Sequence, residues 1–263
     1  MVSFQLDQLY GWITAFLWPF FRILSLVGTA PVLSDSSVPL RVKIGFSALV
    51  TIAIAPSLGP LPQVPPGSYE GLWIAAQQVL IGIALGLTMR IVFAAVQTAG
   101  EFIGLQMGLS FASFFDPATG ANTAVLARLM NVIASLLFLV LNGHLLVLAG
   151  VLRTFEILPI SVHAMNTDGF SVLFEWSSQV LVSGMLLALP LIIILLTINL
   201  ALGILNRTAQ QLSVFAVGFP ITLTTGLILL MVILPQTSPF LSELFDSGYA
   251  AMSRLTQALA SGS

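Results

Sequence analysis

GEFIGLQMGLSFASFFDPATGAN, residues 100–122, interrupts a chain that is otherwise very apolar and almost uncharged. The stretch opens with a glycine and an acid, alternates further glycines with polar side chains, carries three phenylalanines and breaks at Asp116-Pro117. The residue before a proline is disfavoured in the α region, so a helix should end there. A lipid-facing helix has no use for this mixture of side chains. We therefore interpret the stretch as a short element that lines or closes an opening inside a protein.

One face of a helical projection of this stretch carries a methionine and three phenylalanines, at spacing i, i+4, i+7 and i+8. Ordinary helix packing explains that spacing as well as a gate does, and methionine is by default a flexible gap filler. An Asp at such a position most often only stops or caps a helix. The two interpretations, gate and packing element, concern the same residues: Gln106, Met107, Ser110, Phe111, Phe114, Phe115, Asp116 and Pro117.

Composition places the chain among integral membrane proteins. Hydrophobic residues make up 57% of its 263 residues and charged residues 7%, whereas soluble domains carry about 25% charged residues. Eight Lys and Arg and ten Asp and Glu side chains cannot cover the surface of a soluble fold of this size. The only lysine is Lys43 and the arginines are scattered, so we expect contact with a lipid membrane and no nucleic-acid partner.

The sequence offers no constellation for catalysis. The absence of cysteine excludes disulfides and thiolate metal sites. The two histidines, His144 and His163, cannot form a zinc site without carboxylate help. No Ser-His-Asp, metal or phosphate-loop pattern is present in the sequence, so we predict that the protein is not an enzyme and needs no cofactor.

On both sides of residues 100–122, long apolar runs alternate with polar or proline-rich turns. This pattern predicts an all-α chain of membrane-type helical hairpins. The last two runs, joined by a short polar turn, predict a hairpin, and the amphipathic segment after them predicts a surface or interfacial helix. In order, the runs and that segment are Gly11–Leu33, Leu40–Leu58, Leu72–Gly100, Ala124–Val151, Val172–Leu205, Val214–Leu234 and Pro239–Ala260.

Small and polar side chains inside these runs predict contacts with protein. Gly82 and Gly86 form a small-xxx-small pair, which lets two helices approach closely. Ionisable residues within apolar spans are functional candidates by default, although in an obligate assembly a structural contact explains them at least as well. A histidine there is more often a hydrogen-bonded interior residue than a proton relay. The candidates for buried or intersubunit polar contacts are Arg22, Arg90, Glu101, Arg128, His144, Asn199 and Arg207.

Several short motifs occur in an order and spacing that together resemble the FliR family of bacterial flagellar type III export gate subunits, which is related more distantly to the SctT subunits of virulence injectisomes. The resemblance extends from about residue 10 to about residue 245. It rests on residues 100–116 and Arg22, on GTAPVL at 28–33 and RVKIG at 41–45, on NGH at 142–144, and on LTINLALGILNR at 196–207 with GFP at 218–220.

The resemblance implies a role that periodicity does not show. Subunits of this family assemble as one copy with several copies of FliP and FliQ, in a helical hetero-oligomeric ring around an export channel. By analogy, residues 1–170 would be a FliP-like part and residues 171–263 a FliQ-like hairpin with a C-terminal amphipathic helix. The inner loop, matching Gln106–Asn122, would be a plug that helps close the channel. Further implied partners are FlhB and unfolded flagellar export substrates, in the bacterial inner membrane at the flagellar basal body.

A second hypothesis is an autonomous polytopic carrier of a small solute. Its site would use proline-broken helices and the buried polar side chains of Arg22, Glu101, Arg128 and His144. A carrier should be stable as a monomer or a symmetric oligomer and should bind a small ligand. A gate subunit should instead be unstable alone and copurify with its siblings.

Overall fold

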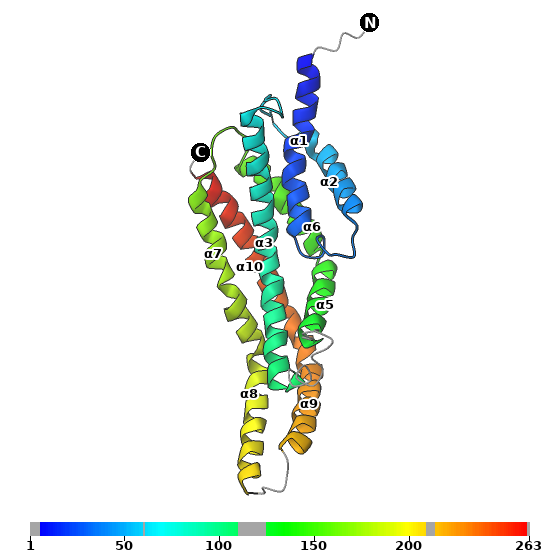
Figure 1. Cartoon of the computed structure of the whole chain (residues 1–263), viewed down its shortest axis with the longest axis vertical. Helices are drawn as coiled ribbons and strands as arrows, with labels where there is room; N and C mark the ends of the chain where they lie inside the picture. The colour runs from blue at the N-terminus through cyan, green and yellow to red at the C-terminus, as the bar shows by residue number, and fades with distance from the viewer. Residues whose placement is uncertain (1–5, 60, 110–124, 209–213, 262–263) are drawn as a thin grey trace. The chain divides into compact units, whose positions relative to one another are not determined.

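A computed structural model describes residues 6–59, 61–109, 125–208 and 214–261. The regular elements in these ranges are helices and short 3-10 turns, with no strand among them, which confirms the all-α prediction. Figure 1 shows the helices along the chain. They are α1 (Leu6–Thr29), α2 (Leu40–Ile54), α3 (Tyr69–Gln106), α5 (Val125–Val140), α6 (Gly143–Ile157), α7 (Ser171–Ser177), α8 (Gln179–Thr208), α9 (Val214–Ile233) and α10 (Thr237–Ala260).

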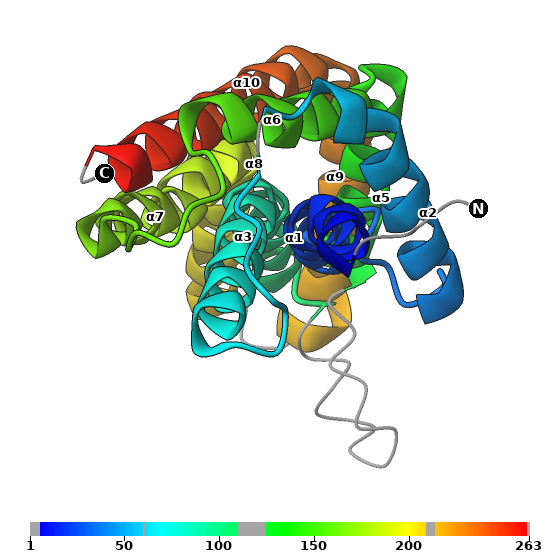
Figure 2. The ribbon, with the colours of Figure 1, turned by 90° about the horizontal axis from the view of Figure 1, so that it is seen from above.

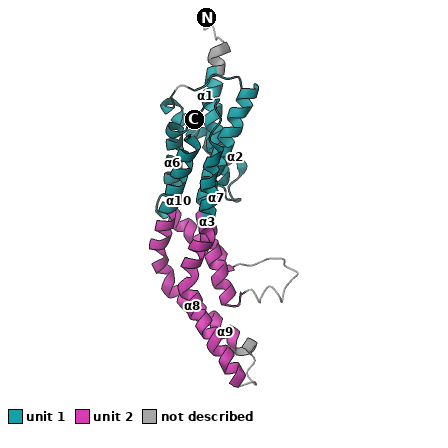
Figure 3. Cartoon of the chain, turned by 90° about the vertical axis from the view of Figure 1, so that its left-hand side faces the viewer, with its two compact units in different colours: residues 1–91, 139–177, 246–263 teal, residues 92–138, 178–245 magenta. Residues whose placement is uncertain are grey.

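The chain divides into two compact units, which Figure 3 colours separately. Unit 1 comprises residues 1–91, 139–177 and 246–263, and unit 2 comprises residues 92–138 and 178–245. The predicted FliP-like and FliQ-like parts are defined by similarity to sibling subunits, which is a different criterion from compactness. That division stays a prediction.

The helices have the length and composition of membrane spans. Within the described ranges, five helical segments are long and apolar enough to cross a membrane, or six if α5 and α6 form one broken span. The break between α5 and α6 contains Asn142, whose φ of 56° lies in the left-handed region that asparagine tolerates. The predicted polytopic, membrane-type character agrees with these lengths.

In unit 1, α1 lies directly against α3 (Figures 1 and 2). A Cβ added at Gly82 of α3 would collide with the hydroxyl of Ser25 and the carbonyl oxygen of Arg22. A Cβ at Gly86 would collide with the hydroxyl of Thr29 and lie 2.8 Å from its Cβ. Only glycine fits at these two positions, so the predicted close approach is confirmed and its partner is α1. Around this contact lies the buried apolar core of unit 1, which includes Trp18, Ile23, Val27, Ile54 and Ile74.

Helix α10 packs its apolar face against other helices of the chain. In unit 1, a Cβ at Gly150 of α6 would lie 2.5 Å from Cε of Met252, so α6 and α10 pack closely. In the same unit, a Cβ at Gly169 would lie 2.7 Å from the backbone nitrogen of Leu259. Met252 and Leu259 are 3% and 0% exposed. The opposite face carries exposed charged side chains such as Arg254. A buried apolar face with an exposed charged face is the pattern of a surface helix, as the sequence predicted, and a place at a lipid interface stays a prediction.

Unit 2 is joined by aromatic and glycine contacts. Phe93 of α3, Phe138 of α5 and Phe245 of α10 form a cluster with ring centroids 5.4, 5.5 and 5.8 Å apart, in the range of favourable aromatic pairs. A Cβ at Gly100 would lie 2.5 Å from Cα of Ala127, so α5 lies against α3 without intervening side chains.

The two long helices of unit 2 form the predicted hairpin. Helix α8 (Gln179–Thr208) and helix α9 (Val214–Ile233) pack against each other. A Cβ at Gly184 of α8 would lie 2.8 Å from the carbonyl oxygen of Ala95, so α8 also packs closely on α3. Helix α8 therefore contacts α3 as well as α9.

Candidate functional site

Arg22 is buried in unit 1 with no exposed surface. Its Nε donates to Oε1 of Gln78 at 2.7 Å, and its Nη1 donates to the hydroxyl of Thr154 at 3.0 Å. Its Nη2 donates to the carbonyl oxygen of Leu158 at 3.0 Å. The guanidinium therefore joins α1 to α3, to α6 and to the residue that ends α6.

The acceptors of Arg22 are all uncharged. The ring of Phe155 lies 4.2 Å from the guanidinium carbon, close enough for a cation–π contact. Amide, hydroxyl and carbonyl oxygens together with this ring thus replace the water that a buried cation loses. The cluster has no nucleophile or general base, and its geometry is that of a structural clamp.

A second cluster surrounds the end of α3 in unit 2. The helix ends because Gly108 adopts a φ of 79°, the left-handed conformation that commonly stops a helix. Just before it, the side chain of Met107 is fully buried, and a Cβ added at Gly226 of α9 would lie 2.6 Å from its Cγ and 2.8 Å from its Sδ. The Met107 side chain therefore lies directly on the backbone of α9.

Two polar side chains of the hairpin reach the last carbonyl groups of α3. Nδ2 of Asn199 donates to the carbonyl oxygen of Gln106 at 3.4 Å. The hydroxyl of Thr222 lies 3.4 Å from the carbonyl oxygen of Met107, and it also lies 3.1 Å from two carbonyl oxygens of its own helix. Both contacts to α3 are long, so each is individually weak.

The structure describes two of the eight candidate gate residues. Gln106 is half-buried, and Met107 is packed inside unit 2 and offers no surface to an opening. The other six, Ser110, Phe111, Phe114, Phe115, Asp116 and Pro117, lie outside the described residues.

The remaining polar candidates are not gathered into one site. Arg90 and Glu101 of α3, Arg128 of α5 and Arg207 of α8 are exposed. His144 is half-buried, and its Nδ1 is buried without a hydrogen-bond partner among the described residues. The expectation of a hydrogen-bonded interior histidine stays a prediction. The candidates that the structure brings together are Gln106, Met107 and Asn199.

The sequence interpretation missed several partners. Gln78 and Thr154 hold Arg22, while Thr222 and Gly226 contact Met107. Gln78 is a polar residue in an apolar run, which indicates packing against another helix, and Thr222 and Gly226 are a pair four residues apart on one helix face. Neither signal identifies the residue that it contacts.

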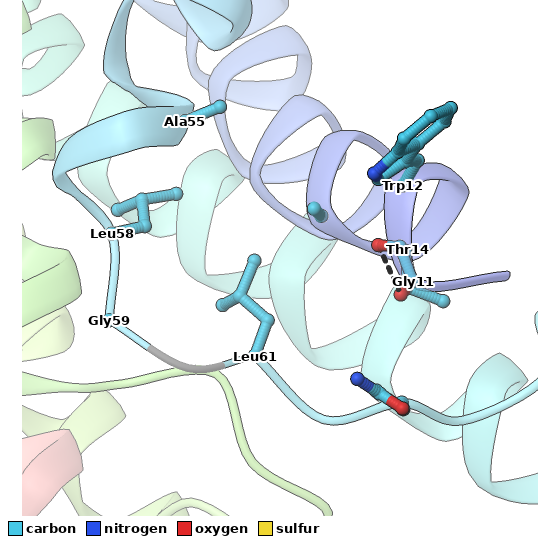
Figure 4. A pocket seen from close by; sticks show the side chains of 9 residues that line it. Gly11, Trp12, Thr14, Ala55, Leu58, Gly59 and Leu61 are labelled. Atoms are coloured by element: carbon cyan, nitrogen blue, oxygen red, sulfur yellow. Dashed lines mark hydrogen bonds between the residues drawn. The ribbon is translucent and has the colours of Figure 1, made fainter. Parts of the chain in front are cut away.

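Three grooves on unit 1 could in principle hold the small solute of the carrier hypothesis. Figure 4 shows one of about 450 Å³, between the first turns of α1, around Trp12, and the connection that follows α2. Two others, of about 840 and 370 Å³, flank α6 and share Ala149 and Arg153. None of these three grooves is lined by the residues that the carrier hypothesis requires. In the part of the chain that the structure describes, no group of three or more His, Asp or Glu side chains could hold a metal.

The chain is similar to known proteins over nearly its whole length. Residues 13–248 match the family described as bacterial export proteins, family 1. The flagellar biosynthetic protein FliR of Escherichia coli (strain K12) is 52% identical over 246 residues, which cover 94% of both chains. FliR of Pectobacterium carotovorum subsp. carotovorum is 46% identical over 99% of this chain and 100% of its own, and FliR of Bacillus subtilis (strain 168) is 32% identical over 83% of this chain and 85% of its own. These matches confirm the resemblance seen in the sequence, and the chain belongs to the FliR family of bacterial export proteins.

Proposed function

We propose that this chain is an inner-membrane subunit of the flagellar protein export gate and forms an export channel with FliP and FliQ. The observation that carries the proposal is the 52% identity to a flagellar biosynthetic protein FliR across 94% of both chains. In the described part of the chain, the Arg22 cluster and the cluster at the end of α3 join helices to one another, and we propose no catalytic step for them.

Exposed apolar side chains support assembly with other subunits. On the α8–α9 hairpin, Leu200 and Met231 are 66% and 81% exposed, and many of their neighbours are similarly open. Contiguous apolar surfaces of this kind mark contacts with protein or lipid. In our proposal, FliP and FliQ cover much of this surface, lipid and FlhB cover other parts, and residues 1–170 and 171–263 occupy FliP-like and FliQ-like places in the ring.

We further propose that Gln106–Asn122 forms the plug that helps to close the channel to unfolded flagellar substrates. The position of the stretch supports this, because it contains Gly108, the glycine at which α3 ends, so the chain leaves the helix at the start of the stretch. The burial of Met107 refines the proposal. Met107 anchors the base of the plug, and the seal comes from the residues that follow.

Coexpression with FliP and FliQ tests the proposed assembly. We expect the chain to copurify with both siblings, at one copy per complex by native mass spectrometry, and to be recovered poorly when it is expressed alone. The carrier hypothesis predicts the reverse. A stable, ligand-binding monomer that does not associate with FliP or FliQ would contradict the proposed function.

Deleting residues 110–116 tests the plug separately. We expect the complex to assemble with unchanged composition but to conduct ions in planar bilayers above the closed level of the wild type, because the apolar seal is gone. A variant of unchanged length, with Phe111, Phe114 and Phe115 replaced by serine, separates loss of the seal from shortening of the loop. If both variants stay at the closed level, the stretch is a packing element.

A further inference from the structure

We propose that Asn199, Thr222 and Gly226, which we call the Met107 seat, are positioning residues that fix the end of α3 and so determine where the chain leaves that helix. The inference rests on the proposed function, because the chain that leaves α3 at this point is the stretch proposed to close the channel. The seat itself consists only of residues on the α8–α9 hairpin.

Gly226 supplies the steric part of the seat. Glycine is less favourable than alanine inside a helix, so its presence in the middle of α9 needs a packing reason. That reason is Met107, whose Cγ, Sδ and Cε would all lie between 2.6 and 2.8 Å from a Cβ at this position. The Cγ is close to the backbone, so Met107 cannot avoid an added methyl group by swinging only its flexible tip.

Asn199 and Thr222 supply the polar part. The last carbonyl groups of a helix have no partner within the helix and must find one elsewhere. The carbonyl oxygens of Gln106 and Met107 are two such groups, and the hairpin offers a donor 3.4 Å from each. The hydroxyl of Thr222 has one proton and lies closer, at 3.1 Å, to two carbonyl oxygens of α9, so both contacts to α3 only assist. The glycine notch is the main element that fixes the end of α3 relative to the hairpin.

The residues that hold Met107 are different from the residues proposed to seal the channel. A change at Gly226 moves Met107 without altering any residue of the stretch proposed to close the channel. A purely structural role for Gly226 would lower complex yield or thermal stability. A positioning role predicts an altered closed state in a complex that still assembles.

The test begins with Gly226→Ala in the complex with FliP and FliQ. We expect complex yield to be kept and conductance to rise severalfold above the closed level. Adding Met107→Ala should return the conductance toward that of the Met107→Ala single variant, because it makes room for the methyl group. Gly28→Ala on α1 is the control, since a Cβ there meets nothing within 4 Å and the residue lies outside the α8–α9 hairpin, and it should change neither yield nor conductance.

Thiol crosslinking provides a readout that does not depend on the plug. The chain has no cysteine, so the pair Met107→Cys and Gly226→Cys reports only on the seat. We expect efficient crosslinking in the assembled complex and almost none for the pair Met107→Cys and Gly203→Cys. Absence of the first crosslink would overturn the proposal that Met107 contacts Gly226. This result decides the question even if the Gly226→Ala complex does not assemble.

The outcomes distinguish the seat from the proposed function. If Gly226→Ala stays at the closed level while the deletion of residues 110–116 leaks, the seat is overturned and the plug stands. If the deletion does not leak, the plug fails, and the crosslink still decides whether Met107 occupies the seat. Equal leakage of Gly226→Ala and Gly28→Ala would also contradict the proposal.

Discussion

Replacing Arg22 by methionine is expected to lower the free energy of unfolding of the chain by about 3 kcal/mol, since hydrogen bonds from a charged group contribute about 1.5–3 kcal/mol each and a buried acceptor left unpaired is costly. Methionine has a similar length and keeps the apolar contact with Phe155. The expected loss of stability therefore comes from the polar contacts. Gln78 and Leu158 would then keep buried oxygens without their donor. A thermal melt of the purified complex, together with its yield, measures the effect.

Two companion variants sharpen the test of Arg22. Lysine keeps the charge but cannot reach three acceptors in a fixed planar arrangement, so Arg22→Lys should recover little of the lost stability. Arg153→Met is the matched control, because Arg153 lies beside Thr154 on α6 and is exposed, and it should leave the melting temperature nearly unchanged. If Arg22→Met melts with the wild type, the three hydrogen bonds do not stabilise the fold.

Gly82→Ala is expected to destabilise unit 1 by about 3 kcal/mol, the upper end of the usual cost of overpacking. The methyl group would collide with the backbone carbonyl of Arg22 in α1, which cannot move without separating the two helices. The same displacement would disturb the hydrogen bonds of Arg22. Thermal melts and complex yields measure the loss.

The control for Gly82→Ala is Gly28→Ala, which we expect not to destabilise the chain. Gly28 also lies in a helix of unit 1, but a Cβ there meets nothing within 4 Å. Alanine is favoured over glycine in a helix by about 1 kcal/mol, so Gly28→Ala should leave stability unchanged or raise it slightly. Similar losses for both variants would show that the glycines matter for a reason other than the close approach of α1 and α3.

The fold class and the close helix contact could both be read from the sequence, because they depend on local patterns. Length and hydropathy predict the spans, and the spacing of Gly82 and Gly86 predicts that some helix lies against them. The identity of that helix could not be predicted. Arg22 meets Gln78 and Thr154 across 56 and 132 residues of chain, and no periodicity encodes such a pairing.

The packing partner of α10 could not be predicted for a related reason. An amphipathic pattern identifies the apolar face of a helix but does not say whether lipid, a partner or the same chain covers that face. Met252 meets Gly150 about a hundred residues earlier in the chain, which only the tertiary structure reveals. For Met107, the helical projection identified a seal or packing position, and the glycine on another helix that receives its side chain was not visible in the pattern.

The Arg22 cluster also imposes an order on biogenesis. The ribosome makes Arg22 56 residues before Gln78, 132 residues before Thr154 and 136 residues before Leu158. A nascent chain that has inserted only α1 therefore carries a cation whose permanent acceptors do not yet exist. Until α6 has been synthesised, that charge has to be accommodated by the translocon, by water or by lipid headgroups, so α1 can settle into its final place only after more than half of the protein has been translated.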